Sequence, residues 1–310
     1  MTAVLRVVKP GLLTTIQDLG RPGAIAGGVP PGGAMDRLAH RAANLLAGNP
    51  AGDATLECTL VGPSLVAERS CVIAIAGGDL SPKVGGRDAP MWTAFTLAEG
   101  ETLSFAGRRA GARAYLAVAG GFEAGRWLGS RSTYLLARRG GIEGRALAEG
   151  DMLERAVDRD VEPGRSLEES LRPDYTRRVL RAMAGPQIRR LDTASRRAFF
   201  GEAWTVSTQS DRMGARLEGP ELAMSGEDVL TFGLVAGAIQ VPRSGQPILL
   251  LADHQTAGGY PVVATVVSAS MPIAGQLAPG DDVRFELITA TQARALRVEQ
   301  AQRLASLSAP

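Results

Sequence analysis

The sequence predicts a mainly β protein with a few short helices, and two observations carry that prediction. First, short apolar runs recur between Gly, Pro or Asp residues, and their lengths and flanks favour strands over helices. Second, the 310 residues include 38 Gly and 18 Pro, so turns are frequent, as in barrels and sandwiches. The clearest runs are CVIAIAGG at 71–78, ARAYLAVAGG at 112–121, QPILLLAD at 246–253 and PVVATVVS at 261–268.

Three segments carry helical signals. Residues 35–50 offer Asp36 as an N-cap, an apolar face, and a Gly-Asn-Pro stop. Residues 193–203 and 289–307 are shorter or more polar candidates. His40 falls opposite the apolar face of the first helix, so we expect it to be exposed to solvent.

One phrase occurs three times, as LAEGETL at 97–103, LAEGDML at 147–153 and LAPGDDV at 277–283. Each has an apolar start, a turn with Gly next to an acid, and a strand that follows, which is hairpin chemistry. A looser echo pairs AVAGGF at 117–122 with QTAGGY at 255–260. The recurrence indicates two related β domains.

The length of 310 residues and 45% hydrophobic content suit two domains. Residues 154–178 are highly charged and poor in large apolar side chains, as a connecting segment should be. We therefore expect an N-terminal β domain at 1–155, a charged linker at 156–177, a C-terminal β domain at 178–288 and a helical tail at 289–310.

Composition argues against several function classes. The formal net charge is only +2, and no basic cluster is interleaved with aromatics, so nucleic acid is not an expected partner. No apolar stretch approaches the ~20 residues of a membrane span, and the N-terminus lacks a signal-peptide core. We expect a cytoplasmic protein without membrane contact.

The lysines and cysteines limit the chemistry further. Lys9 and Lys83 are the only lysines, and neither GxxxxGK[ST] nor GxGxxG occurs, so the usual phosphate-binding motifs are missing. Cys58 and Cys71 lie in apolar surroundings without the spacing of metal ligands, which predicts buried free thiols in a reducing compartment. No metal site is predicted.

Four segments place polar groups among Gly and Pro: residues 14–36, 128–135, 206–220 and 252–266. Any one of them could be an ordinary turn, and an Asp near an Arg is usually a local ion pair. Four together indicate functional loops on a strand scaffold. The candidate catalytic residues are Asp253, Gln255, Tyr260 and Asp211. The candidate substrate-binding residues are Gln17, Asp18, Arg21, Arg131, Ser132, Thr133, Gln209, Ser210, Arg212 and His254.

A Ser-His-Asp hydrolase is the obvious rival. Only His40 and His254 exist, and no serine lies in a GxSxG elbow. A triad would therefore have to be assembled from residues that lie far apart in the chain.

The motifs together resemble the KipA-like family, which is also known as the C component of 5-oxoprolinase, as allophanate hydrolase subunit 2 or as the biotin-dependent carboxyltransferase family. The resemblance runs in order over about residues 5–287. It rests on KPGLLTTIQDLGRPG, GVPPGGAMD followed by AANLLAGNP, ARAYLAVAGG, GSRSTYL, QSDRMGARLEGP, GAIQVP, GQPILLLAD and QTAGGYP.

The resemblance implies two cyclophilin-like β barrels and a KipI-like component as partner. In bacterial 5-oxoprolinase, the KipA-like and KipI-like components are thought to phosphorylate 5-oxoproline with ATP. A LamB/YcsF-like component then completes hydrolysis to glutamate. We expect the present chain to be this KipA-like component of a hydrolase that acts on a small lactam or amide. ATP would be shared with the KipI-like partner.

Two alternatives stay open. Relatives in urea carboxylase move a carboxyl group from carboxybiotin to urea. Neither lysine here lies in a biotinyl context, so biotin would have to be carried by another chain. A KipA-like protein that antagonises a KipI-like kinase inhibitor without catalysis is the second alternative.

The family resemblance also shows departures. Many relatives read ADRQTTGGYPK, so that His254, Ala257 and Val262 replace an Arg, a Thr and a Lys. A neutral His or a Val cannot neutralise an anion as those groups do. We expect either that Arg131 or Arg212 stabilises the anion, or that the substrate differs, with Asp253 taking a proton from the attacking group.

Overall fold

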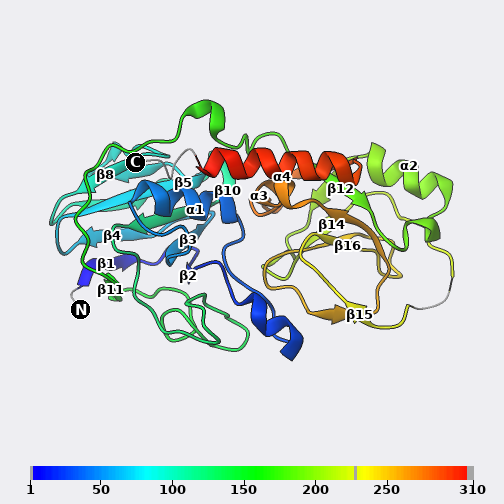
Figure 1. Ribbon diagram of the computed structural model, residues 1–310, viewed down its shortest axis with the longest axis horizontal. Coiled ribbons are helices and arrows are strands. Elements are labelled where there is room, and N and C mark those ends of the chain that lie inside the picture. Colours follow the sequence, from blue (N-terminus) through cyan, green and yellow to red (C-terminus); the bar gives the residue numbers. More distant parts are fainter. Residues whose placement is uncertain (1–2, 227–228, 306–310) are drawn as a thin grey trace. The chain divides into compact units, whose positions relative to one another are not determined.

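The computed structural model describes residues 3–226 and 229–305 and is mainly β, as predicted (Figure 1). The chain divides into two compact units. The first comprises Met1–Arg21, Gly32–Tyr175 and Arg303–Pro310, and the second comprises Pro22–Pro31 and Thr176–Gln302.

Two antiparallel sheets make up the first unit, in the orders β11-β1-β4-β9-β6-β7 and β2-β3-β10-β5-β8. The predicted strands at 71–78 and 112–121 are confirmed as β5 and β10, which pair with each other. The bounds are β1 Ala3–Lys9, β2 Leu13–Gln17, β3 Thr55–Thr59, β4 Ser64–Ala67, β5 Cys71–Asp79, β6 Pro82–Val84, β7 Arg87–Asp88, β8 Ala94–Leu97, β9 Thr102–Phe105, β10 Ala110–Val118 and β11 Met152–Glu154.

The core of the first unit is formed by apolar side chains from both sheets. Leu5 on β1 and Leu65 on β4 are fully buried in one cluster with Leu56 on β3 and Ile73 on β5. Burying such side chains contributes about 1.5–3 kcal/mol each. Cys58 and Cys71 belong to this cluster as free thiols, as predicted, and burial raises the pKa of both.

Helix α1, Arg37–Leu46, lies against β5 and β10. Its predicted N-cap is confirmed, because the Asp36 carboxylate accepts hydrogen bonds from the backbone N–H groups of Leu38 and Ala39. The prediction that His40 is exposed is wrong. The helix is buried on a second, polar face as well, where His40 Nδ1 lies 2.9 Å from Thr55 Oγ1.

A closed barrel forms the second unit, in the order β12-β19-β16-β17-β14-β13-β20. The predicted strands at 246–253 and 261–268 are confirmed as β17 and β19. The bounds are β12 Val179–Ala184, β13 Trp204–Val206, β14 Gly214–Glu218, β16 Ala238–Gln240, β17 Ile248–Leu250, β19 Val262–Val266 and β20 Asp282–Leu287, with β15 Phe232–Gly233 and β18 Ala257–Gly258 as a separate pair.

The remaining helices are short, apart from the tail. The predicted helices at 193–203 and 289–307 are confirmed as α2 and α4. The bounds are α2 Thr193–Gly201, α3 Met271–Ala274 and α4 Ala290–Ala305, and the 3-10 segments are Pro22–Gly27, Glu169–Leu171, Ile188–Arg190 and Ser268–Ser270. Residues 306–310 of the predicted tail lie outside the described residues.

The repeated phrase folds into the same turn three times. In the third copy the N–H of Asp281 donates to the carbonyl of Ala278, and the Asp281 carboxylate accepts the N–H of Ala278. Gly280 has a φ of 82°, which only a glycine adopts easily, and its N–H donates to the carbonyl of Val206. The other copies form the same pairs, Glu101 with Ala98 and Asp151 with Ala148.

The charged segment expected as a linker packs on the first unit as far as Tyr175. Leu167 is buried and its N–H donates to the carbonyl of Trp92 over 2.9 Å. The hydroxyl of Tyr175 donates to the Asp36 carboxylate over 2.6 Å. The few apolar side chains of this charged segment therefore pack within the first unit.

The burial of His40 makes stability depend on pH. Burial lowers the pKa of His40 from 6.5 to about 4; Asp18 and Glu57 oppose this shift, and Arg41 and Arg37 add to it. The ring is neutral in the fold but is protonated in the unfolded chain below pH 6.5. The unfolded state therefore binds more protons, and stability falls as the pH falls from about 6.5 toward 4.

We expect His40 to contribute roughly 3 kcal/mol to the loss of folding stability between pH 6.5 and 4. Urea unfolding of the wild type and His40→Asn from pH 4 to 8 measures it, and the variant should show the smaller slope below pH 6.5. Parallel curves over the whole range would contradict the assignment.

Candidate functional site

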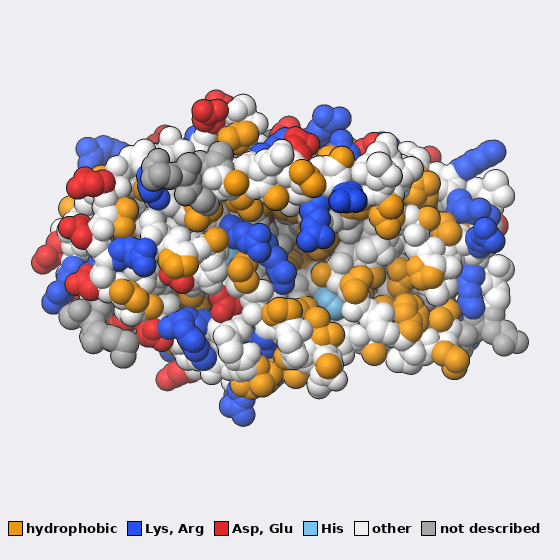
Figure 2. Space-filling model, in the orientation of Figure 1, with side chains coloured by type: hydrophobic (Ala, Val, Ile, Leu, Met, Phe, Trp, Pro, Cys, Tyr) orange, Lys and Arg blue, Asp and Glu red, His pale blue; other side chains and the backbone are white. Residues whose placement is uncertain are grey.

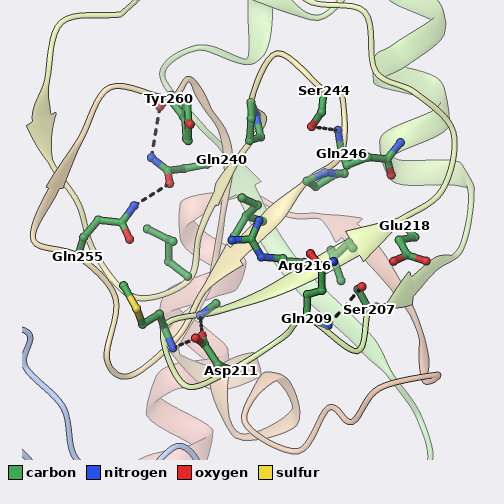
Figure 3. Close-up of a pocket in the computed structure, with 17 residues that line it drawn as sticks. Ser207, Gln209, Asp211, Arg216, Glu218, Gln240, Ser244, Gln246, Gln255 and Tyr260 are labelled. Atoms are coloured by element: carbon green, nitrogen blue, oxygen red, sulfur yellow. Dashed lines mark hydrogen bonds between the residues drawn. The ribbon is translucent and has the colours of Figure 1, made fainter. Parts of the chain in front are cut away.

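A pocket of about 450 Å³ lies in the second unit and is lined by strands β14, β16 and β17, by the loop before β14, and by the loops after β16 and β17 (Figure 3). This volume suits a small organic ligand. The lining residues are Ser207, Gln209, Asp211, Met213, Gly214, Arg216, Leu217, Glu218, Gln240, Pro242, Ser244, Gln246, Pro247, Ile248, Leu250, Gln255 and Tyr260.

The strand pairing sets the order of the side chains in the wall. Arg216 on β14 pairs with Ile248 on β17, and Ile248 pairs with Gln240 on β16. Because neighbouring strands lie about 4.8 Å apart, the Cα atoms of Arg216 and Gln240 are about 10 Å apart across this row. Their strand neighbours Ala215 and Ile239 are fully buried on the opposite face.

Among the residues that the structure describes, Arg216 is the one lysine or arginine that lines the pocket, and the sequence patterns did not single it out. Its side chain forms no ion pair within the described ranges 3–226 and 229–305. The signal was present, because buried Ala215 and Leu217 flank Arg216 and alternation places it on the other face. The Ser210 hydroxyl accepts the Arg216 N–H over 3.0 Å and holds this part of the strand in place.

Two glutamine side chains form a chain of amides at the other side of the pocket (Figure 3). Gln240 Nε2 donates to the carbonyl of Tyr260 over 3.5 Å, so Gln240 Oε1 is the acceptor for Gln255 Nε2 at 3.3 Å. Gln240 is buried and Gln255 is half-buried. This arrangement leaves Gln255 Oε1 without a hydrogen-bond donor among the described residues, as an acceptor for a ligand.

Steric contacts explain why residue 258, the first of the glycine pair after Gln255, is a glycine. A Cβ atom on Gly258 would lie 2.9 Å from Leu234 Cδ1 and 3.3 Å from Gln240 Nε2. The backbone can therefore approach the amide chain only where the side chain is a hydrogen.

Behind the pocket, Arg212 and Asp253 form a buried bidentate ion pair. Arg212 Nε and Nη2 lie 2.8 and 3.3 Å from the two carboxylate oxygens of Asp253. The N–H of Asp253 also donates to the carbonyl of Arg212 over 2.9 Å. The pair joins the loop that carries Gln209 and Asp211 to the loop that carries Gln255.

His254 also lies behind the lining. It is 1% exposed, and its Nδ1–H donates to the carbonyl of Gln255 over 2.7 Å. Burial lowers its pKa, so the neutral ring orients the Gln255 backbone rather than presenting a positive charge. Val262 is buried in β19, and Ala257 is exposed in β18.

Asp211 combines a structural bond with an accessible position. Its Oδ1 accepts the N–H groups of Met213 at 2.8 Å and Gly214 at 3.1 Å, which fixes the turn into β14. The residue is exposed and lines the pocket. Asp211 and Glu218 give the pocket two carboxylates, and Arg216 gives it a guanidinium.

The first-unit candidates meet at Asp18. Asp18 Oδ1 accepts the hydroxyls of Ser130 and Ser132 at 2.6 Å and the N–H of Gly20 at 2.7 Å. Asp18 Oδ2 accepts the N–H of Arg131 at 2.6 Å. These donors occupy the carboxylate, so Asp18 fastens residues 130–132 to the end of β2.

The neighbours of Asp18 are also engaged. Arg131 Nη2 lies 2.5 Å from Glu123 Oε2, and Arg21 Nη2 donates to the carbonyl of Ser132. Gln17 Nε2 donates to the carbonyl of Thr133 over 3.2 Å. Arg21 also lies over the Trp127 ring, 5.0 Å from its centroid.

A buried polar network in the first unit was not foreseen. The Tyr115 hydroxyl donates to Glu57 Oε2 over 2.7 Å and accepts the N–H of Asp36 over 2.7 Å. Glu57 Oε2 also accepts the N–H of Met35. Burial raises the pKa of Tyr115 well above its ordinary value. These groups satisfy the loop that leads into α1.

The structure thus brings four of the predicted residues together in the pocket: Gln209, Asp211, Gln255 and Tyr260. Ser210, Arg212, Asp253 and His254 support the lining from outside it. Gln17, Asp18, Arg21, Arg131, Ser132 and Thr133 belong to the first unit.

Two broader features bear on function. Within residues 3–226 and 229–305, no three His, Cys, Asp or Glu side chains are grouped to hold a metal ion. None of the helices described is both long and apolar enough to cross a membrane. Figure 2 shows basic, acidic and apolar side chains intermingled on one face of the molecule.

The model of the family described as carboxyltransferase domain, subdomain A and B, matches residues 27–287. The chain belongs to the carboxyltransferase domain family. The chain is 36% identical to the C component of 5-oxoprolinase from Escherichia coli K12 over 305 residues, which cover 96% of this chain and 95% of that protein.

The chain is also similar to urea amidolyases. It is 32% identical to the enzyme of Saccharomyces cerevisiae over 98% of this chain and 18% of that protein. The crystal structure of K. lactis urea amidolyase superposes with a TM-score of 0.92 at 30% identity, over 98% of this chain and 20% of that one. The chain therefore spans about one fifth of the urea amidolyases.

We expect Asp253→Ala to reduce stability strongly, by about 3–5 kcal/mol, because it removes the carboxylate that pairs with the buried Arg212 guanidinium. Urea unfolding measures the loss. The matched double variant, Arg212→Met with Asp253→Leu, should recover most of it. An Asp253→Ala protein as stable as the wild type would show that the pair is not a structural clamp.

Proposed function

We propose that this chain is the C component of an ATP-dependent 5-oxoprolinase and that the pocket of the second unit binds the lactam. The similarity to the E. coli protein over nearly the full length of both chains supports the role. The observation that carries the assignment of the site is the amide chain from Tyr260 through Gln240 to Gln255. It presents an acceptor that matches the N–H of a secondary amide.

In this proposal the side chains hold the ring and position its reacting carbonyl. Gln255 Oε1 accepts the lactam N–H, and the half-exposed Tyr260 covers one side of the ring. Asp211 keeps one carboxylate oxygen for a proton, because its Oδ1 is engaged by the turn. Asp253 was the first candidate for this role, but its carboxylate is bound to Arg212, so Asp211 is the better candidate.

The pocket does not fit the triphosphate of ATP. Its lining carries one guanidinium against the carboxylates of Asp211 and Glu218. Lys83 is paired with Asp88 at 2.7 Å, and neither Lys83 nor Lys9 lines the pocket. We therefore assign phosphate binding mainly to the KipI-like component, with the LamB/YcsF-like component completing hydrolysis.

A second candidate function is carboxyl transfer to urea or a related amide. The family model over residues 27–287 and the 98% coverage in the match to yeast urea amidolyase favour it. The amide chain would suit urea as well, because urea also offers N–H donors beside a carbonyl. Biotin would then be carried by another chain.

The assembly of this chain with its KipI-like and LamB/YcsF-like partners should release ADP in response to 5-oxoproline. Gln255→Ala should lower kcat/KM by roughly 10- to 100-fold, because it removes the acceptor for the lactam N–H. Gln302→Ala, on the exposed surface of α4, is the matched control and should retain wild-type activity.

Absence of 5-oxoproline-dependent ADP release by the wild-type assembly overturns the proposal. Turnover that needs urea and a carboxylated biotin carrier would support the second candidate instead. Stable association with the KipI-like component, without turnover of either substrate, would point to a binding protein that is not catalytic.

A further inference from the structure

The pocket contains one unpaired positive charge. Among the described residues, Arg216 forms no ion pair, although Asp211 and Glu218 line the same pocket. A guanidinium at a pocket wall is suited to bind a carboxylate with two parallel hydrogen bonds. The neutral amides of Gln240 and Gln255 cannot replace this charge.

The positions of Arg216 and the amide chain are fixed by the barrel. Arg216, Ile248 and Gln240 form one row across three paired strands, so the Cα atoms at its ends are about 10 Å apart. The side chain of Arg216 enters the pocket from one side, and the side chain of Gln255 enters it from another (Figure 3). Ile248 lies between Arg216 and Gln240 in this row and adds an apolar side chain to the pocket lining.

We propose that Arg216 is a specificity-determining residue. It makes the pocket select a cyclic amide that carries a carboxylate on the ring carbon next to the amide nitrogen. Arg216 binds the carboxylate, Gln255 Oε1 accepts the N–H, and the methylene groups of the ring contact Ile248. This inference deepens the proposed function, on which its choice of ligand rests. It is independent of turnover, because it concerns binding only.

The acids near Arg216 limit the kind of anion. Glu218 follows Arg216 by two residues on the same face of β14, so their Cα atoms are about 7 Å apart. A ligand with one carboxylate neutralises Arg216 and brings no further negative charge toward Glu218 and Asp211. A ligand with several negative charges would be repelled by both carboxylates.

Separate contacts support the two recognition groups. Ser210 holds the Arg216 backbone through its hydroxyl, and His254 holds the Gln255 carbonyl. The buried pair of Arg212 and Asp253 joins the two loops. Either recognition side chain can therefore be altered without removing the support of the other.

Three probes test the inference by direct binding to the assembly in the absence of ATP, measured by calorimetry. 5-Oxoproline has both the carboxylate and the amide, 2-pyrrolidinone has only the amide, and cyclopentanecarboxylate has only the carboxylate. The protein variants are Arg216→Ala, Gln255→Leu and the control Arg197→Ala, an exposed arginine on α2. Thermal unfolding of each variant establishes that it is folded.

Arg216→Ala should weaken 5-oxoproline and cyclopentanecarboxylate roughly 10- to 100-fold and leave 2-pyrrolidinone unchanged. Gln255→Leu should weaken 5-oxoproline and 2-pyrrolidinone and spare cyclopentanecarboxylate. Arg197→Ala should bind all three probes as the wild type does.

The inference is overturned if Arg216→Ala binds 5-oxoproline as tightly as the wild type, if it weakens all three probes equally, or if the wild type does not bind 5-oxoproline. If the probes bind as expected but ADP is not released, the specificity assignment stands and the proposed oxoprolinase reaction fails.

Discussion

The buried ion pair between Arg212 and Asp253 holds together the two loops from which the pocket is built. Arg212 sits between Asp211 and the start of β14, and Asp253 sits two residues before Gln255. Burying two charges costs solvation free energy, which is offset only while the guanidinium and the carboxylate keep good hydrogen-bond geometry. The positions of Asp211 and Gln255 relative to each other depend on this geometry.

The barrel supplies the second constraint, which is the alternation of side chains along each strand. On β14 the exposed residues Arg216 and Glu218 alternate with buried Ala215 and Leu217. A shift of one residue in the pairing with β17 would exchange the two faces. Core packing in the barrel therefore also fixes which polar groups a ligand meets.

Much of this could be predicted from the sequence. The apolar runs identified β5, β10, β17 and β19, and the Gly-rich polar segments contained Gln209, Asp211, Gln255 and Tyr260. Local signals of this kind depend on residues that are close in the chain, such as the cap formed by Asp36 on α1.

The rest depended on contacts between distant parts of the chain. Asp253 looked like a free carboxylate because its partner lies 41 residues earlier. His40 looked exposed because nothing in its own helix indicated that Thr55 would cover it. Gln240 carried no local signal, since its partners Tyr260 and Gln255 come together only when β16 pairs in the barrel.

The amide chain has a consequence for the conditions under which a ligand is held. Glutamine amides do not titrate, and a guanidinium stays charged at any pH that the protein survives. Recognition by Arg216, Gln240 and Gln255 is thus constant across the neutral range, and a pH optimum there would report the chemical step or the partner proteins.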